Sequence, residues 1–190
     1  MAASVLFMSM SVDGFIADPN DALGGKDGNR LHHWGLKPDG ETFRTEGAAG
    51  ALMALYNETG AVVAGRRTAE ITDHWGGTHH GMPIFVPTHR PPGPTVANYP
   101  LVTYVQDGIE SAMAQARAAA GDKDVLVHGA YTAQRALAAG VLDEIQLHLI
   151  PVLLGQGRRL FDVLPAEVEL EIVRVVDTPE ATHLRYRVRR

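Results

Sequence analysis

Cysteine is absent from the 190 residues, which excludes disulfide bonds and thiolate metal sites. No uncharged apolar run approaches the roughly 18 residues that a membrane-spanning helix needs. Acidic residues outnumber basic ones by 22 to 17, and the net charge of −5 argues against a general nucleic-acid surface. The first residues lack the basic n-region of a signal peptide and reach Asp13 early. We therefore expect a cytoplasmic protein that binds neither membrane nor nucleic acid.

Apolar residues are plentiful, at 45% of the chain, and can bury the core of a single domain over residues 1–190. Helical spacing of apolar residues, with a closing glycine, predicts helices over 45–60, 109–121 and 133–140. Short apolar runs predict strands at residues 4–10, 61–64, 83–86, 101–105, 125–127 and 145–150. Strands that alternate with helices in this way indicate a largely parallel sheet covered on both faces.

The C-terminal residues have a different pattern, in which apolar and charged residues alternate over 168–172 and 184–188. This alternation predicts an antiparallel hairpin with one face in water, joined through Asp177–Glu180. Glutamates on one strand can pair with arginines on the other, at about 0.2 to 1 kcal/mol for each pair. An anion-binding arginine stripe is the alternative interpretation.

Three turns each follow a predicted strand and carry phosphate-binding residue types: Gly65–Thr68, Thr88–Arg90 and Gly129–Thr132. The carboxyl ends of parallel strands lie at one edge of a sheet, and ligands of open α/β sheets bind there. Arginine side chains and the free amides of helix N-termini both favour anions. The three turns together therefore predict a site for an extended phosphate-bearing ligand.

Histidine and tryptophan allow more than one interpretation. Five histidines match no standard metal-binding spacing, so we expect solvated loop histidines and no metal: His74, His79 and His80, with His32 and His33. Trp34 and Trp75 can stack on a flat substrate or close the core. Asp143 precedes a predicted strand and is expected to fix the turn there, with contact to a substrate as the alternative.

Three segments resemble the dihydrofolate reductase-like superfamily: SVDGFIA at 11–17, VAGRRTAE at 63–70 and GVLDEIQLHLIPVLLGQGRRLF at 140–161. The pattern is most similar to the reductase domain at the C-terminus of the bifunctional deaminase-reductase of riboflavin biosynthesis. This resemblance implies an α/β fold with a mixed, mostly parallel sheet of about eight strands, flanking helices and a C-terminal antiparallel hairpin. The C-terminal hairpin and the strand at 145–150 are expected to offer sheet edges that need covering, and the resemblance implies a homodimer.

The implied activity is hydride transfer from NADPH to a C=N or C=O bond of a small heterocyclic or ribosylaminopyrimidine-like substrate. A nucleotide-binding protein without turnover is the alternative. On the substrate side, the candidates are Asp13, Trp34, Leu153, Leu154, Gly155 and Gly157. On the cofactor side, with Arg66 at the adenosine 2′-phosphate, they are Val12, Gly14, Ile16, Gly65, Arg66, Arg67, Thr68, Thr88, His89, Arg90, His128, Gly129, Ala130, Tyr131 and Thr132.

Two departures from the family pattern concern the cofactor and the substrate. His128 stands where the family has the first of two adjacent glycines, and its ring is expected to crowd the cofactor or to shift the loop. Folate reductases have a pteridine-binding carboxylate where this chain has Ala48, Ala49 and Gly50. Dihydrofolate is therefore not the expected substrate.

Overall fold

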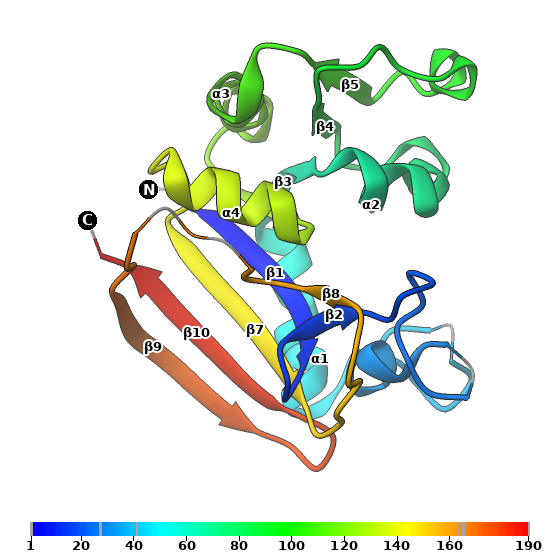
Figure 1. Cartoon of the computed structure of the whole chain (residues 1–190), viewed down its shortest axis with the longest axis vertical. Coiled ribbons are helices and arrows are strands. Elements are labelled where there is room, and N and C mark those ends of the chain that lie inside the picture. The colour runs from blue at the N-terminus through cyan, green and yellow to red at the C-terminus, as the bar shows by residue number, and fades with distance from the viewer. Residues whose placement is uncertain (1, 27, 41, 163, 165, 190) are drawn as a thin grey trace. The chain divides into compact units, whose positions relative to one another are not determined.

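The predicted α/β architecture is confirmed by the computed structural model, which describes residues 2–26, 28–40, 42–162, 164 and 166–189. The main sheet has eight strands: β1 (Ser4–Ser11), β3 (Thr59–Ala64), β4 (Ile84–Pro87), β5 (Val102–Val105), β6 (Asp124–His128), β7 (Glu144–Ile150), β9 (Leu170–Asp177) and β10 (Thr182–Val188). Their order is β5-β4-β3-β6-β1-β7-β10-β9. The sheet is mostly parallel, and β9 and β10 form the antiparallel pair (Figure 1).

Short elements complete the chain. A second sheet pairs β2 (Phe15–Ala17) with β8 (Arg158–Arg159) in antiparallel orientation. The α-helices are α1 (Gly47–Met53), α2 (Arg66–Ile71), α3 (Gly108–Ala120) and α4 (Ala130–Ala138), and the 3₁₀ helices are η1 (Arg30–Gly35), η2 (Ala54–Glu58), η3 (Asp73–Gly77) and η4 (Pro94–Asn98). Within the described residues, no helix is both long and apolar enough to cross a bilayer.

The chain divides into two compact units. Unit 1 comprises residues 2–6 and 57–144, and unit 2 comprises residues 7–56 and 145–189. A single domain over residues 1–190 stays a prediction.

Unit 1 is built around the parallel pair of β3 and β6. Val62 of β3 lies opposite Leu126 of β6, and both are buried because apolar side chains leave both faces of these strands. Helix α3 buries Ala112, Met113 and Ala116 and ends at Gly121, whose φ of +62° suits a glycine. The predicted strand at 125–127 and the predicted helix at 109–121 are thus confirmed.

Asp143 ties the start of β1 to the end of unit 1. Its Oδ2 accepts hydrogen bonds from the Ser4 amide at 2.9 Å, the Ser4 hydroxyl at 2.8 Å and Arg117 Nη2 at 2.8 Å. Three donors on one carboxylate oxygen favour the structural interpretation of Asp143 over contact with a substrate.

Strand β7, in unit 2, differs from the prediction in two ways. The sequence alternates apolar residues with Gln146 and His148, yet those two side chains are only 2% and 0% exposed. The expectation that residues 145–150 form an open edge is also wrong, because β7 has β1 on one side and β10 on the other. His148 is tolerated inside this strand because its Nδ1 lies 2.7 Å from His183 Nδ1 within the core.

The C-terminal hairpin forms as predicted, but its apolar face is not covered. Val188, Tyr186 and Leu184 alternate along β10, so their cross-strand partners Leu170, Ile172 and Val175 share one face of the hairpin. The three β9 side chains are 39%, 67% and 54% exposed. The charged face behaves as expected in one place, where Arg187 lies 3.6 Å from Glu171.

Helix starts were the least accurate expectation. Helix α1 begins at Gly47, two residues after the predicted start at residue 45, and its N-cap Glu46 makes no side-chain hydrogen bond to the helix. The α-helix ends at Met53, and η2 continues to Glu58, so the strand after it begins two residues earlier than the pattern indicated. Helix boundaries depend on cap geometry that a periodicity does not contain.

Candidate functional site

Two of the three predicted phosphate-binding turns touch each other in unit 1. The Gly65 amide donates to the His128 carbonyl at 3.2 Å, which joins the carboxyl ends of β3 and β6. A Cβ on Gly65 would lie 2.6 Å from Thr132 Oγ1, closer than real contacts allow. Only glycine therefore permits this approach of the turn after β3 to α4.

Gly129 shapes the second turn. Its φ of +95° is unfavourable for any residue with a side chain, and a Cβ there would lie 2.8 Å from Thr68 Oγ1. Helix α4 starts at the next residue, Ala130, so its first amides lie directly after this turn. Ala130 and Thr132 are buried, whereas the Tyr131 side chain is 66% exposed.

Arg66 connects the third turn to the first. Its Nη1 donates to the Pro91 carbonyl at 3.0 Å, and its Nε donates to Glu70 Oε1 at 2.6 Å. The Arg90 amide donates to Thr88 Oγ1 at 3.2 Å, which folds residues 88–90 into a compact turn. The predicted turns therefore meet in one unit.

The neighbouring side chains complete this group. Arg67, His89 and Arg90 are exposed, and Thr68 and Thr88 are half-buried. The unit 1 cofactor candidates thus lie on the three turns, with His128 at the end of β6, and their role stays a prediction.

His128 packs into the protein. Its side chain is 9% exposed, and its ring centroid lies 5.9 Å from Trp75 and 5.2 Å from His79. Burial, with His128 and His80 adding to it, lowers the pKa of His79, so His79 is neutral at pH 7. The described part of the chain has no cis peptide bond, so the His128–Gly129 link is trans.

The expectation of solvated histidines was wrong for His74 and His79, which are 3% and 4% exposed. His74 Nε2 lies 2.9 Å from the Tyr104 hydroxyl, and Asp73 accepts a hydrogen bond of 2.8 Å from Tyr99. These contacts hold η3 in a left-handed turn, and Trp75 of this turn packs against His79 and His128. Among the described residues, no group of three or more histidine, aspartate or glutamate side chains could hold a metal ion.

Unit 2 contains the substrate-side candidates, and Asp13 organises them. Its Oδ1 accepts from the Ser11 hydroxyl at 2.6 Å and the Leu154 amide at 3.1 Å, and its Oδ2 accepts from the Gly155 amide at 2.7 Å. The Ser11 hydrogen bond is the main cause that lowers the pKa of Asp13, and both amides add to it against the effect of burial. An ionised carboxylate with both oxygens engaged suits positioning of the loop rather than proton donation.

The loop that Asp13 holds is open to solvent. Leu153 is 70% exposed, Gly155 and Gly157 are exposed, and Leu154 is half-buried. Val12 is 56% exposed, whereas Ile16 is buried in β2. The exposed residues are therefore the ones free to contact a ligand.

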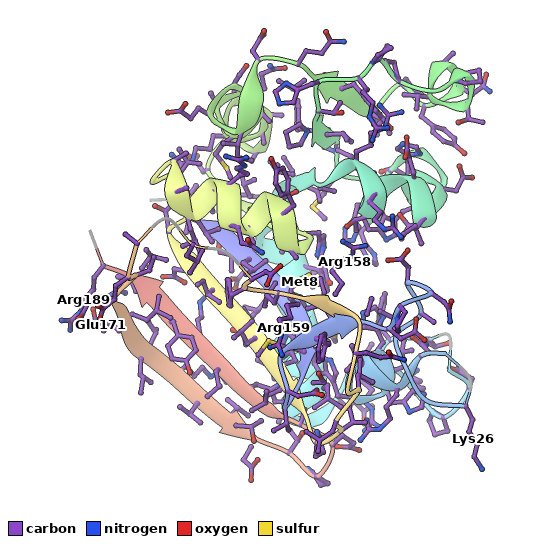
Figure 2. The ribbon with its side chains drawn as sticks, in the orientation of Figure 1. Met8, Lys26, Arg158, Arg159, Glu171 and Arg189 are labelled. Atoms are coloured by element: carbon purple, nitrogen blue, oxygen red, sulfur yellow. The ribbon has the colours of Figure 1, made fainter. Side chains whose placement is uncertain are left out.

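Arg159 and Ser11 belong to this arrangement, although the sequence interpretation did not select them. Arg159, which is labelled in Figure 2, lies near β2. Its Nη1 donates to the Asp13 carbonyl at 3.2 Å, and its guanidinium lies 4.6 Å from the centre of the Phe15 ring. A Cβ on Gly14 would lie 3.3 Å from the same guanidinium. Ser11 and Arg159 both lie in the segments that carry the family resemblance, at 11–17 and 140–161. This position is the sequence signal that could have identified them.

Trp34 lies in the core of unit 2, at 3% exposure. Its indole N–H donates to Ser9 Oγ at 2.8 Å, and its ring stacks on His148 with 3.9 Å between centroids. His148 Nδ1 lies 2.7 Å from His183 Nδ1 in the same cluster. This packing favours the interpretation of Trp34 as a core residue.

The hydrogen-bond partners of His148 and His183 determine which ring nitrogen of each histidine carries the proton. Thr178 gives its hydroxyl hydrogen to the Ala181 carbonyl, so Thr178 Oγ1 accepts from His183 Nε2–H. His183 Nδ1 then accepts from His148 Nδ1–H, which leaves a lone pair on His148 Nε2. That atom is buried without a hydrogen-bond partner among the described residues, so protonating it would bury an uncompensated charge.

Residues 4–184 match the sequence profile of the RibD C-terminal domain. The chain belongs to this family. No curated protein matches the chain. Membership in the RibD C-terminal family confirms the resemblance found in the sequence and supports an oxidoreductase of the RibD type.

Solved structures share the fold of this family. A putative riboflavin biosynthesis protein from a Shewanella species superposes with a TM-score of 0.76 at 23% identity, over 99% of each chain. A deaminase/5-amino-6-(5-phosphoribosylamino)uracil reductase from Thermotoga maritima has a TM-score of 0.63 at 13% identity, and 98% of this chain covers 56% of that one. A dihydrofolate reductase from Enterococcus faecalis, complexed with NADP(H) and RAB-propyl, has a TM-score of 0.60 at 14% identity, over 99% of this chain and 97% of that one.

Proposed function

We propose that this protein is an NADPH-dependent reductase of a small heterocyclic, ribosylaminopyrimidine-like substrate. The observation that carries the proposal is the meeting of three turns in unit 1, each of which follows a parallel strand. Membership in the RibD C-terminal family supports the same reaction class. A relative in Thermotoga is named as a 5-amino-6-(5-phosphoribosylamino)uracil reductase, and the dihydrofolate reductase carries NADP(H).

The residues of unit 1 fit a dinucleotide. Gly65 and Gly129 let the two turns pack closely, because a side chain at either position would collide with Thr132 or Thr68. Backbone amides at such places can approach a pyrophosphate closely. Arg66 keeps N–H groups beyond its two hydrogen bonds, which suits the adenosine 2′-phosphate.

The chemistry requires little from the protein beyond binding and orientation. Bound NADPH would supply a hydride, and a solvent proton completes the reduction of a C=N or C=O bond. Asp13 holds the amides of Leu154 and Gly155 in place, so the exposed 153–157 loop is presented in one conformation. Asp13 positions this loop and stays ionised.

The test is turnover with defined substrates. Purified protein is mixed with NADPH and either 5-amino-6-(5-phosphoribosylamino)uracil or dihydrofolate, and loss of NADPH absorbance is followed alongside the product mass. The proposal predicts oxidation of NADPH with the pyrimidine, a product two hydrogens heavier, and no reaction with dihydrofolate. Saturable binding of NADPH without turnover on any C=N or C=O substrate of this class would make the protein a binding protein instead.

We also propose a homodimer formed through β9. This strand is the last in the sheet order, and its exposed Leu170, Ile172 and Val175 share a face. Glu171, which is labelled in Figure 2, and Arg174 lie on either side of the apolar centre of β9. Antiparallel pairing of the β9 strands of two copies therefore brings opposite charges together. Sedimentation should give twice 20.5 kDa at micromolar concentration, and Ile172→Glu should give the monomer. A wild-type monomer contradicts this assembly.

A further inference from the structure

Arg66 is held by three different contacts within unit 1. Its Nε donates to Glu70 at 2.6 Å, its Nη1 donates to the Pro91 carbonyl at 3.0 Å, and its guanidinium lies 5.6 Å from the centre of the Tyr104 ring. The side chain of Arg66 is 19% exposed, whereas that of Glu70 is 44% exposed. The position of the guanidinium is therefore set before any ligand arrives.

Glu70 affects Arg66 in two opposing ways. The hydrogen bond to Glu70 orients the guanidinium and, with the bond to the Pro91 carbonyl, leaves three of its five N–H groups without a partner among the described residues. The carboxylate also cancels part of the positive charge that an anion would meet. Both charges are felt at Tyr104, where burial raises the pKa, Glu70 raises it further and Arg66 lowers it.

We propose that Glu70 sets the preference of this protein between NADPH and NADH. The inference rests on the proposed function, in which Arg66 binds the adenosine 2′-phosphate. Repulsion between the Glu70 carboxylate and that phosphate weakens NADPH binding and leaves NADH, which has no 2′-phosphate, unaffected. The protein therefore discriminates between the two dinucleotides less than a free arginine would allow.

A purely structural role for Glu70 gives a different expectation. Residues 66 and 70 are four apart on α2, and an exposed helical pair of this kind contributes about 0.3 to 0.5 kcal/mol to stability. Removing such a pair would change the binding of both dinucleotides equally. The ratio of the dissociation constants for NADPH and NADH therefore distinguishes a role of Glu70 in cofactor preference from a purely structural role.

Glu70→Gln is the decisive variant because it keeps an acceptor for Arg66 Nε and removes the charge. Dissociation constants for NADPH and NADH are measured by energy transfer from tryptophan in the wild type, in Glu70→Gln and in Glu58→Gln. Glu58 is an exposed glutamate that precedes the amino end of β3, so its variant controls for net charge. We expect NADPH to bind about three- to tenfold more tightly in Glu70→Gln, NADH to be unchanged, and Glu58→Gln to match the wild type.

The salt dependence of binding and a second variant, Glu70→Ala, test the inference further. The gain for NADPH should shrink at high salt, since repulsion between partly exposed charges is screened. Glu70→Ala, which also removes the acceptor, should gain less than Glu70→Gln. An equal change for both dinucleotides, no change, or weaker NADPH binding in Glu70→Gln would overturn the inference while leaving the reductase proposal standing. If the wild type binds neither dinucleotide, the proposed function itself fails.

Discussion

The two candidate regions of this protein are held in place by different means. In unit 1, turns meet because glycines let backbone and hydroxyl groups approach to distances that a Cβ would prevent. In unit 2, one carboxylate, that of Asp13, holds a loop through two backbone amides. Arg66 keeps N–H groups without a partner among the described residues, so it is suited to bind a ligand. Both oxygens of Asp13 accept hydrogen bonds, so Asp13 is suited to position the loop that would contact a ligand.

The largest expected effect comes from breaking the unit 2 arrangement. Asp13→Asn replaces one acceptor oxygen by an amide that cannot accept from Gly155 or Leu154, so the 153–157 loop loses its fixed conformation. Turnover should fall by about 100-fold, since small misplacement of a substrate-contacting loop has effects of this order. Steady-state kinetics measures the fall, with the dissociation constant for NADPH changing much less. Wild-type turnover in Asp13→Asn would contradict the positioning role.

Gly129→Ala tests the backbone approach in unit 1. The substitution adds a Cβ 2.8 Å from Thr68 Oγ1 at a residue with φ of +95°, so strain and overpacking combine. We expect a loss of about 2 to 4 kcal/mol in the free energy of unfolding and loss of NADPH binding. Urea unfolding and the energy-transfer titration measure the two effects.

Gly140→Ala is the matched control for that variant. Gly140 also has positive φ, at +65°, but a Cβ there would meet nothing within 4 Å. It should cost about 1 kcal/mol from backbone strain and leave NADPH binding intact. Equal losses in the two variants would mean that the approach to Thr68 has no special importance.

Acid should weaken the core of unit 2. Burial is the main cause that lowers the pKa of His183 to about 4 and the pKa of His148 well below its ordinary value, while Asp177 and Glu180 oppose the shift of His183. Because these folded-state pKa values are depressed, the unfolded chain takes up protons first as pH falls below about 6.5. Stability is therefore complete above that pH and is lost progressively toward pH 4.

His183 alone should account for about 2 kcal/mol of the loss between pH 7 and pH 5. Urea unfolding at the two pH values measures it, and His183→Gln should show a smaller loss over the same interval. If the variant and the wild type lose the same amount, other groups are responsible. This result would leave the account of the Asp13 loop unchanged, since the pKa of Asp13 is lowered from its ordinary value and its carboxylate is ionised throughout that range.

The smallest effect is expected for the exposed pair of Arg187 and Glu171, whose side chains are 54% and 44% exposed and 3.6 Å apart. Arg187→Gln should lower the free energy of unfolding by about 0.2 to 1 kcal/mol, in low salt only. Urea unfolding at two salt concentrations measures this difference. A larger, salt-independent loss would show that the charged face of the hairpin is buried in an assembly.

Local sequence patterns predicted most of the fold. Apolar runs such as 125–127 identified buried strands, and glycines such as Gly121 and Gly129 marked helix ends and turns, because these features depend on a few consecutive residues. The parallel order of the strands also predicted that the turns at Gly65 and Gly129 would meet. The identity of the family followed from motifs spread along the chain.

Partners distant in sequence were not predictable in the same way. The pairing of His148 with His183 joins residues 35 positions apart, so no local pattern of residues could predict it. Burial of His74 likewise involves Tyr99 and Tyr104, and His79 packs against His128, so both depend on residues from later segments. The exposed apolar face of β9 was missed because alternation indicates two faces and cannot say which of them is covered.

Titration of the purified protein with NADPH, followed by energy transfer from tryptophan to the nicotinamide, tests the central claim most directly. The account predicts saturable binding below about 1 mM, and weaker binding of NADPH, but not of NADH, in Arg66→Ala. Absence of saturable binding in the wild type would contradict the assignment of the three turns in unit 1 to a dinucleotide.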